Sequence, residues 1–145
     1  MIFVSFKDFV AALPPTGRLL GIDWGVRRTG TAVSDESREF VFPREILAGA
    51  EHFTPLQEIV RSEKIVGIII GLPMHADGTD SDTTRSVRGF AEKLAAAVDI
   101  PITLVDERLS SAAASEIVGN RKLDAAAAAV ILEDAISAIQ RTQYV

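Results

Sequence analysis

The chain has 145 residues, of which 48% are hydrophobic and 24% charged, with no cysteine and a formal net charge of −5. This length suits a single domain, residues 1–145, in which residues 1–17 form a short N-terminal extension. The absence of cysteine excludes a disulfide scaffold, a zinc knuckle and a thiol nucleophile. The acidic balance excludes a broad basic surface, so a polyanion must be held by a local basic patch or by metal ions.

Membrane and export signals are missing from the sequence pattern. No apolar run approaches the roughly 20 residues of a membrane span, because the longest, Ile65 to Leu72, is the length of a strand. The N-terminus has neither the basic start nor the cleavage site of a signal peptide. We therefore expect a soluble, cytoplasmic protein with no membrane partner.

The first half of the chain predicts one helix and then a three-stranded meander. The helix runs from a Ser5 cap to Leu13, before prolines and a glycine break it. The three strands are expected over 18–24, 29–33 and 40–46. Their connections are too short for parallel neighbours, which need a crossover of a dozen or more residues.

Helices and strands alternate in the second half. We expect helices over 54–63, 82–98, 110–118 and 123–140, and strands over 65–70 and 102–105, with a polar loop over 74–81. The whole order predicts an α/β, three-layer sandwich: a five-stranded mixed sheet with helices on both faces. This order matches the ribonuclease H-like fold.

Acidic residues stand where a sheet of this kind binds ligands. One predicted strand ends at Asp23 and another at Asp106-Glu107, and ligands of open α/β sheets lie beyond the carboxyl ends of strands. Asp124 precedes five alanines, whose small side chains let a helix approach the sheet closely and bring Asp124 to the same place. Converging carboxylates repel each other unless a cation offsets them, and oxygen ligands select Mg²⁺ or Mn²⁺. Two such ions about 4 Å apart support phosphodiester hydrolysis.

Each of these residues also has a structural interpretation. Asp23 can be a turn residue that binds backbone amides, and Asp124 can be a helix N-cap. The acids of the segment 106–108 can form an exposed ion pair with Arg108. Trp24 can stack on a base, although a lone tryptophan beside a buried strand favours the core. Only the combination of the acids favours a metal site.

Four ordered motifs carry a more specific resemblance. They are GIDWGVRRTG at 21–30, which continues through Ala-Val-Ser-Asp at 32–35; VGIIIGLPMHADG at 66–78; DERLSS at 106–111; and Asp124 with the alanines that follow it. With these motifs the chain resembles the YqgF/RuvX family over about residues 18–139. Members of that family are RuvC-like, ribonuclease H-fold proteins described as Holliday junction resolvases and as nucleases that mature the 5′ end of pre-16S ribosomal RNA.

The resemblance implies a metal-dependent nuclease that uses Mg²⁺ or Mn²⁺, with two ions expected. Its catalytic and metal-binding residues would be Asp23, Asp106, Glu107 and Asp124. Because neighbouring strand residues face opposite sides of a sheet, one of Asp106 and Glu107 faces the metals and the sequence does not choose between them. The substrate is expected to be pre-rRNA. The alternatives are a four-way DNA junction and a non-catalytic, RNA-binding role in ribosome assembly, and the oligomeric state stays open.

Basic residues near these motifs are the predicted substrate contacts, namely Arg27, Arg28, Arg108, His75, Arg121 and Lys122, with Arg85 or Arg88 of the helix after the polar loop as further candidates. Arg27 and Arg28 match the basic pair of the family and are expected to bind phosphate, with solvated turn charges as the alternative. His75 lies in the polar loop, either as a proton relay or as an exposed loop residue. The loop Gly119 to Lys122 is shorter than is usual in the family, and whether this weakens the activity stays open.

Overall fold

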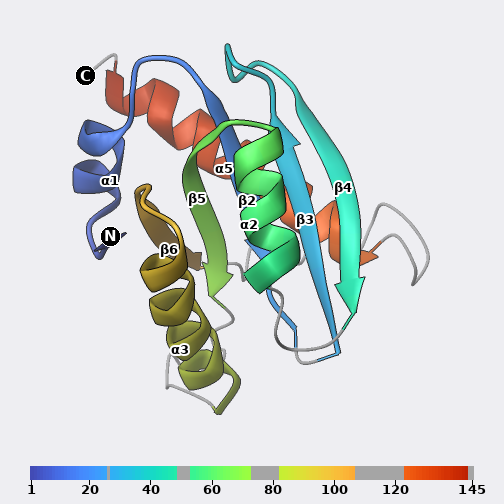
Figure 1. The fold of residues 1–145 in the computed structure, drawn as a ribbon. Coiled ribbons are helices and arrows are strands. Elements are labelled where there is room, and N and C mark those ends of the chain that lie inside the picture. The colour runs from blue at the N-terminus through green and yellow to red at the C-terminus, as the bar shows by residue number, and fades with distance from the viewer. Residues whose placement is uncertain (26, 49–52, 73–81, 107–122, 144–145) are drawn as a thin grey trace.

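The computed structural model describes residues 1–25, 27–48, 53–72, 82–106 and 123–143 (Figure 1). Within these ranges only the backbone is described for residues 82–84, 106, 123–125 and 142–143. The elements are β1 (Ile2–Phe3), α1 (Phe6–Ala12), β2 (Arg18–Asp23), β3 (Arg28–Ser34), β4 (Val41–Ala48), α2 (Phe53–Ser62), β5 (Ile65–Leu72), α3 (Asp82–Ala97), β6 (Ile102–Asp106) and α5 (Leu123–Gln143). The predicted helix 110–118 and the polar loop 74–81 lie outside the described residues.

All of these strands belong to one mixed sheet with the order β1-β6-β5-β2-β3-β4. The β2–β3–β4 meander is antiparallel, as the short connections predict, whereas β5 pairs in parallel with both β2 and β6. The parallel strands β2, β5 and β6 therefore all end on one side of the sheet, which we call the carboxyl end of the sheet. Beyond this end ligands collect in folds of this class.

The sheet has six strands in the described part of the chain, so the prediction of five is wrong by one. The additional strand is β1, which pairs with Ile102 and Thr103 of β6. The Ile102 N–H donates to Met1 O at 2.9 Å, and the Thr103 hydroxyl donates to Phe3 O at 3.0 Å. Two residues are too few for an alternating pattern to reveal a strand.

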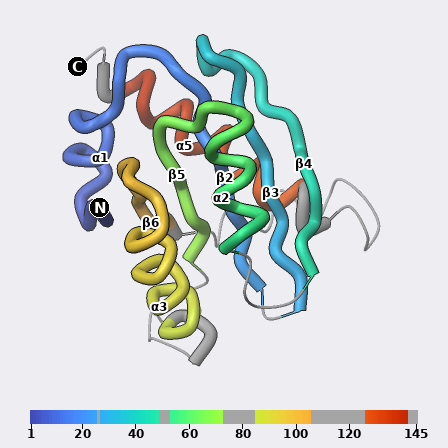
Figure 2. Tube along the Cα trace, in the orientation of Figure 1, coloured from blue at the N-terminus to red at the C-terminus, as the bar shows by residue number. Residues whose placement is uncertain are grey.

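The sheet separates two apolar cores. One core lies under α2 and α3 and includes Ile22, Ile70 and Phe90, and the other lies under α1 and α5 and includes Phe9, Leu19 and Leu132. Figures 1 and 2 show α1 near the C-terminal part of α5, consistent with their shared core. The Ser5 hydroxyl accepts the Asp8 N–H as the predicted cap of α1. No helix among the described residues is long and apolar enough to cross a membrane.

Trp24 lies in the core under α2 and α3, as the structural interpretation of this residue predicts. Its side chain is 8% exposed, and its ring centroid lies 6.0 Å from that of Phe90, which in turn stacks on Phe53 at 5.6 Å. The indole Nε1 is buried with no hydrogen-bond partner in the described structure. Trp24, the residue that follows Asp23, is therefore packed between the sheet and two helices.

Gly89 in the interior of α3 offers a simple test of this helix. A Cβ at this position would meet no atom within 4 Å, so alanine fits without strain. We expect Gly89→Ala to raise the free energy of unfolding by about 0.5–1 kcal/mol, because glycine loses more backbone entropy in a helix. Urea denaturation measures the change, and a lower midpoint for the variant would contradict the described environment of Gly89.

Asp35 caps the turn between β3 and β4. Its carboxylate accepts the N–H groups of Glu39 at 2.8 Å and Phe40 at 2.9 Å, and the Ser37 hydroxyl at 2.7 Å. The Phe40 N–H, and then the Ser37 hydroxyl, hold the pKa of Asp35 below its usual 3.8. A carboxyl group with a lowered pKa stabilises the fold above the pKa of the unfolded chain, and this contribution disappears as the pH falls through the lowered value.

We therefore expect an NMR titration of the Asp35 side-chain carboxyl carbon to give a pKa below 3.8. In the native chain, protonation of Asp35 at low pH lowers the free energy of unfolding. The Asp35→Asn variant should lack this contribution to the pH dependence of stability. A measured pKa at or above 3.8 would show that these three hydrogen bonds do not hold the carboxylate in solution.

Candidate functional site

Asp23 is the last residue of β2, a central strand between β5 and β3. It is half-buried, and its backbone pairs with Gly30 of β3. Leu19 packs in the core under α5, and the α-carbon of Gly21 faces α5. Since side chains alternate along a strand, Asp23 lies on this same face. The strand thus presents a carboxylate at the carboxyl end of the sheet, on the α5 side.

The turn after Asp23 explains the glycine of the first motif. A Cβ on Gly25 would lie 2.3 Å from Arg28 O, so only glycine fits. Thr29 closes the turn, because its hydroxyl accepts the Gly25 N–H at 3.3 Å and lies 3.4 Å from Gly25 O as a donor. This role of Thr29 is not apparent from the sequence, where only the Gly-x-x-x-Thr spacing indicates it. The contact between Gly25 and Thr29 thus joins the backbone just after Asp23 to the start of β3.

Helix α5 crosses β2 at Gly21, two residues before Asp23. A Cβ on Gly21 would lie 2.9 Å from both Ala128 O and the Leu132 Cβ, so backbone and helix are in direct contact. The predicted close approach of the alanine-rich helix is confirmed. Figure 1 shows α5 running diagonally behind β2 and β3.

The direction of α5 determines where the backbone of Asp124 lies. Its C-terminal half lines a hollow with residues 38–41, at the end of the sheet opposite to Asp23. The backbone of Asp124 lies on the other side of the Gly21 crossing, one helical turn before Ala128, about 6 Å along the helix axis.

Asp106 ends β6 on the far side of β5. It pairs with Leu72, and Val105 pairs with Gly71, so β6 and β5 end together. Ile22 pairs with Ile70, which places Asp23 level with Gly71. The backbones of Asp23 and Asp106 are therefore two strand spacings apart, about 10 Å, at the carboxyl end of the sheet.

The fold thus brings the backbones of three of the four predicted acids towards the carboxyl end of the sheet. Only the side chain of Asp23 is described, and Glu107 lies outside the described residues. Among the side chains that the structure describes, no three acids or histidines gather as a metal-binding group. The four metal ligands, Asp23 included, therefore remain a prediction.

Of the six predicted substrate contacts, Arg27 and Arg28 are described, and so are the further candidates Arg85 and Arg88, which are both exposed on α3. Arg27 and Arg28 are exposed: Arg27 lies between β2 and β3, and Arg28 is the first residue of β3. The others, His75, Arg108, Arg121 and Lys122, lie outside the described residues. Arg88 of α3 is also exposed and lines a pocket with Leu72, the residue that pairs with Asp106.

Comparison with known families shows to which family the chain belongs. The family model of RuvX, described as a Holliday junction resolvase, matches residues 17–138. The chain belongs to the RuvX family. Similar RuvX-type relatives include a protein of Maridesulfovibrio salexigens, 43% identical over 80% of this chain and 95% of its own length, and one of Sphingopyxis alaskensis, 37% identical over 97% of this chain and 100% of its own. Both carry the name of a candidate pre-16S rRNA nuclease.

The fold of this RuvX chain is also similar to that of solved RuvC structures. RuvC of T. thermophilus in complex with a Holliday junction substrate superposes with a TM-score of 0.61, at 12% identity, over 87% of this chain and 97% of RuvC. A second Thermus thermophilus RuvC structure gives a TM-score of 0.59 at 13% identity. The ribonuclease H-like fold class predicted from the sequence is confirmed.

Proposed function

We propose that this RuvX-family chain is a metal-dependent endonuclease that hydrolyses phosphodiester bonds in structured RNA, with the 5′ end of pre-16S rRNA as its substrate. The observation that carries the proposal is the position of Asp23. This half-buried carboxylate ends the central strand, on the face that α5 contacts at Gly21. The names of the Maridesulfovibrio and Sphingopyxis relatives support the choice of substrate.

The donor set fits Mg²⁺ or Mn²⁺. Asp23 offers carboxylate oxygens, and the chain has no cysteine that would favour a softer metal. Asp23, Asp124 and one of Asp106 and Glu107 would hold the ions. Bound in this way, two divalent ions supply the charge that activates water and neutralises a leaving oxygen.

The residues of the chain itself position the substrate. Arg27 and Arg28 are exposed beside Asp23, where their guanidinium groups can pair with backbone phosphates. The hydrogen bond from the Gly25 N–H to the Thr29 hydroxyl joins the residues that flank them. A phosphate held there would lie next to the Asp23 carboxylate, and the reaction needs no protein nucleophile.

A second candidate function is resolution of four-way DNA junctions, which the description of the RuvX family model favours. The experiment that separates the two uses a 5′-extended 16S rRNA precursor and a four-way DNA junction under identical conditions. We expect the native chain to cleave the RNA in Mg²⁺ and to lose this activity in a chelator. Faster cleavage of the junction would support the resolvase, and RNA binding without cleavage would support a non-catalytic assembly role.

A further inference from the structure

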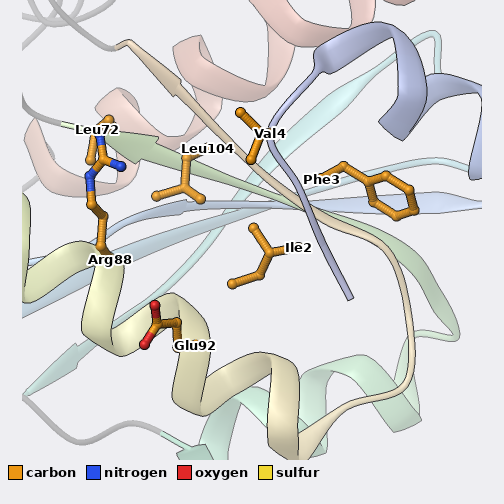
Figure 3. Close-up of a pocket in the computed structure, with 7 residues that line it drawn as sticks. All are labelled: Ile2, Phe3, Val4, Leu72, Arg88, Glu92 and Leu104. Atoms are coloured by element: carbon orange, nitrogen blue, oxygen red, sulfur yellow. The ribbon is translucent and has the colours of Figure 1, made fainter.

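A pocket of about 300 Å³ opens between β1, the ends of β5 and β6, and α3 (Figure 3). Its apolar wall comes from Ile2, Val4, Leu72 and Leu104, and Figure 3 shows Arg88 and Glu92 reaching it from α3. Ile2 and Leu104 are only partly buried, and Val4 is 98% exposed. Apolar surface is therefore left open to a ligand here.

The pocket adjoins the candidate catalytic end of the sheet. Leu72 lines the pocket and pairs with Asp106, the acid at the end of β6. Figure 3 shows the Arg88 side chain extending towards Leu72. The pocket lies on the α3 face of the sheet, whereas Asp23 lies on the α5 face. A nucleic acid that crosses the carboxyl end of the sheet, with its scissile phosphate at Asp23, would have a neighbouring nucleotide within reach of this pocket.

The two charged groups of the pocket have no partner in the described part of the chain. Neither Arg88 nor Glu92 makes a hydrogen bond or ion pair there, although they are one helical turn apart on α3. A guanidinium group pairs well with phosphate, and a carboxylate accepts hydrogen bonds from base amino groups. In one nucleotide, the phosphate would pair with the Arg88 guanidinium group and the base amino group would donate to the Glu92 carboxylate. The face of the base ring would pack on the apolar wall between them.

On this basis we propose that the pocket binds one unpaired nucleotide of the RNA substrate, next to the cleavage site. The proposal rests on the proposed function and specifies its substrate. A volume of about 300 Å³ lies at the lower end of small-ligand pockets, which suits a single base. Sequence-specific recognition of RNA typically uses such unpaired bases, whereas the arms of a DNA junction keep theirs paired. The pocket therefore favours an RNA with a single-stranded segment.

The N-terminal segment completes this pocket. Ile2, Phe3 and Val4 contribute to its lining, and all three precede residue 17, where the match to the family model begins. Strand β1 is held against β6 by the Thr103–Phe3 hydrogen bond and by the pairing of Ile2 with Ile102. The short extension thus contributes a wall of a substrate pocket as well as a part of the core.

Two binding measurements test the proposal, both in the Asp23→Asn background so that the RNA stays intact. In the first, the affinity for a 5′-extended 16S precursor with an unpaired leader is compared between Arg88→Ala and Lys93→Ala. Lys93 is an exposed cation of the same helix that does not line the pocket, so this control removes the same charge. We expect roughly 10-fold weaker binding for Arg88→Ala than for Lys93→Ala, and no such difference on a four-way DNA junction.

In the second measurement, the same RNA carries 4-thiouridine in the leader and is photocrosslinked to the protein. We expect a crosslink in the tryptic peptide 1–7, which contains β1. Equal affinities of the two variants together with crosslinks only outside this peptide would overturn the pocket proposal. Cleavage of the RNA by the native chain tests the nuclease function separately, so either proposal can fail alone. Absence of RNA binding would overturn both proposals.

Discussion

The Asp23→Asn variant should cleave the RNA precursor about 10²- to 10⁴-fold more slowly than the native chain while keeping its fold. The expected loss follows from the position of Asp23 at the carboxyl end of the sheet, where its carboxylate is proposed to hold a metal ion. Metal stabilisation of a phosphoryl transition state contributes several kcal/mol, and each 1.36 kcal/mol corresponds to about a factor of ten in rate. Single-turnover cleavage in Mg²⁺ measures the effect, and circular dichroism checks the fold.

A matched control is Asp99→Asn. Asp99 is exposed and precedes β6, so it lies at the opposite end of the sheet from Asp23. The same chemical change there should leave the cleavage rate within about twofold of the native value, because exposed charges far from the reaction contribute little. Full activity of Asp23→Asn would place the active site elsewhere or assign the cleavage to a contaminating nuclease.

Gly21→Ala should have the largest effect on stability. The added Cβ would lie 2.9 Å from both Ala128 O and the Leu132 Cβ, so α5 must move away from β2. Overpacking of this kind lowers the free energy of unfolding by about 1–3 kcal/mol. Because α5 also carries Asp124, we expect weaker Mg²⁺ binding in the same variant. The Mg²⁺ concentration that gives the half-maximal cleavage rate should therefore rise. Urea denaturation and a Mg²⁺ titration of the cleavage rate measure the two effects.

The Gly89→Ala variant is the control for this substitution, since it adds the same methyl group where nothing lies within 4 Å. The two variants should change stability in opposite directions. If Gly21→Ala were as stable and active as the native chain, the close contact between β2 and α5 would not exist in solution.

Much of the fold could be predicted because its signals are local. The apolar run 18–24 predicts a buried strand with Asp23 near its end, and β2 occupies 18–23. The five alanines predict a close helix–strand contact, and Ala128 makes it. The short connections of the meander exclude parallel pairing there, and β2, β3 and β4 are antiparallel. These features depend on residue size, polarity and spacing, which the sequence shows directly.

Features that depend on tertiary partners could not be predicted. Strand β1 exists because β6 offers it an edge, and two residues carry no periodicity. Arg38 resembles a surface residue in the sequence but is 6% exposed, because its guanidinium group binds Gly17 O and Pro14 O across the turn at the start of β2. The pocket beside α3 combines residues from four elements, of which only Leu72 belongs to one of the four sequence motifs. The choice between Asp106 and Glu107 also depends on how the chain continues beyond β6.

The measurement that tests the central claim most directly is a crystal structure of the native chain soaked in Mn²⁺, with an anomalous difference map to locate the ions. We predict Mn²⁺ in coordination contact with the Asp23 carboxylate at the carboxyl end of the sheet. The same ions should contact Asp124 and one of Asp106 and Glu107. Anomalous peaks only at other places, with Asp23 bound solely to protein groups, would contradict this prediction.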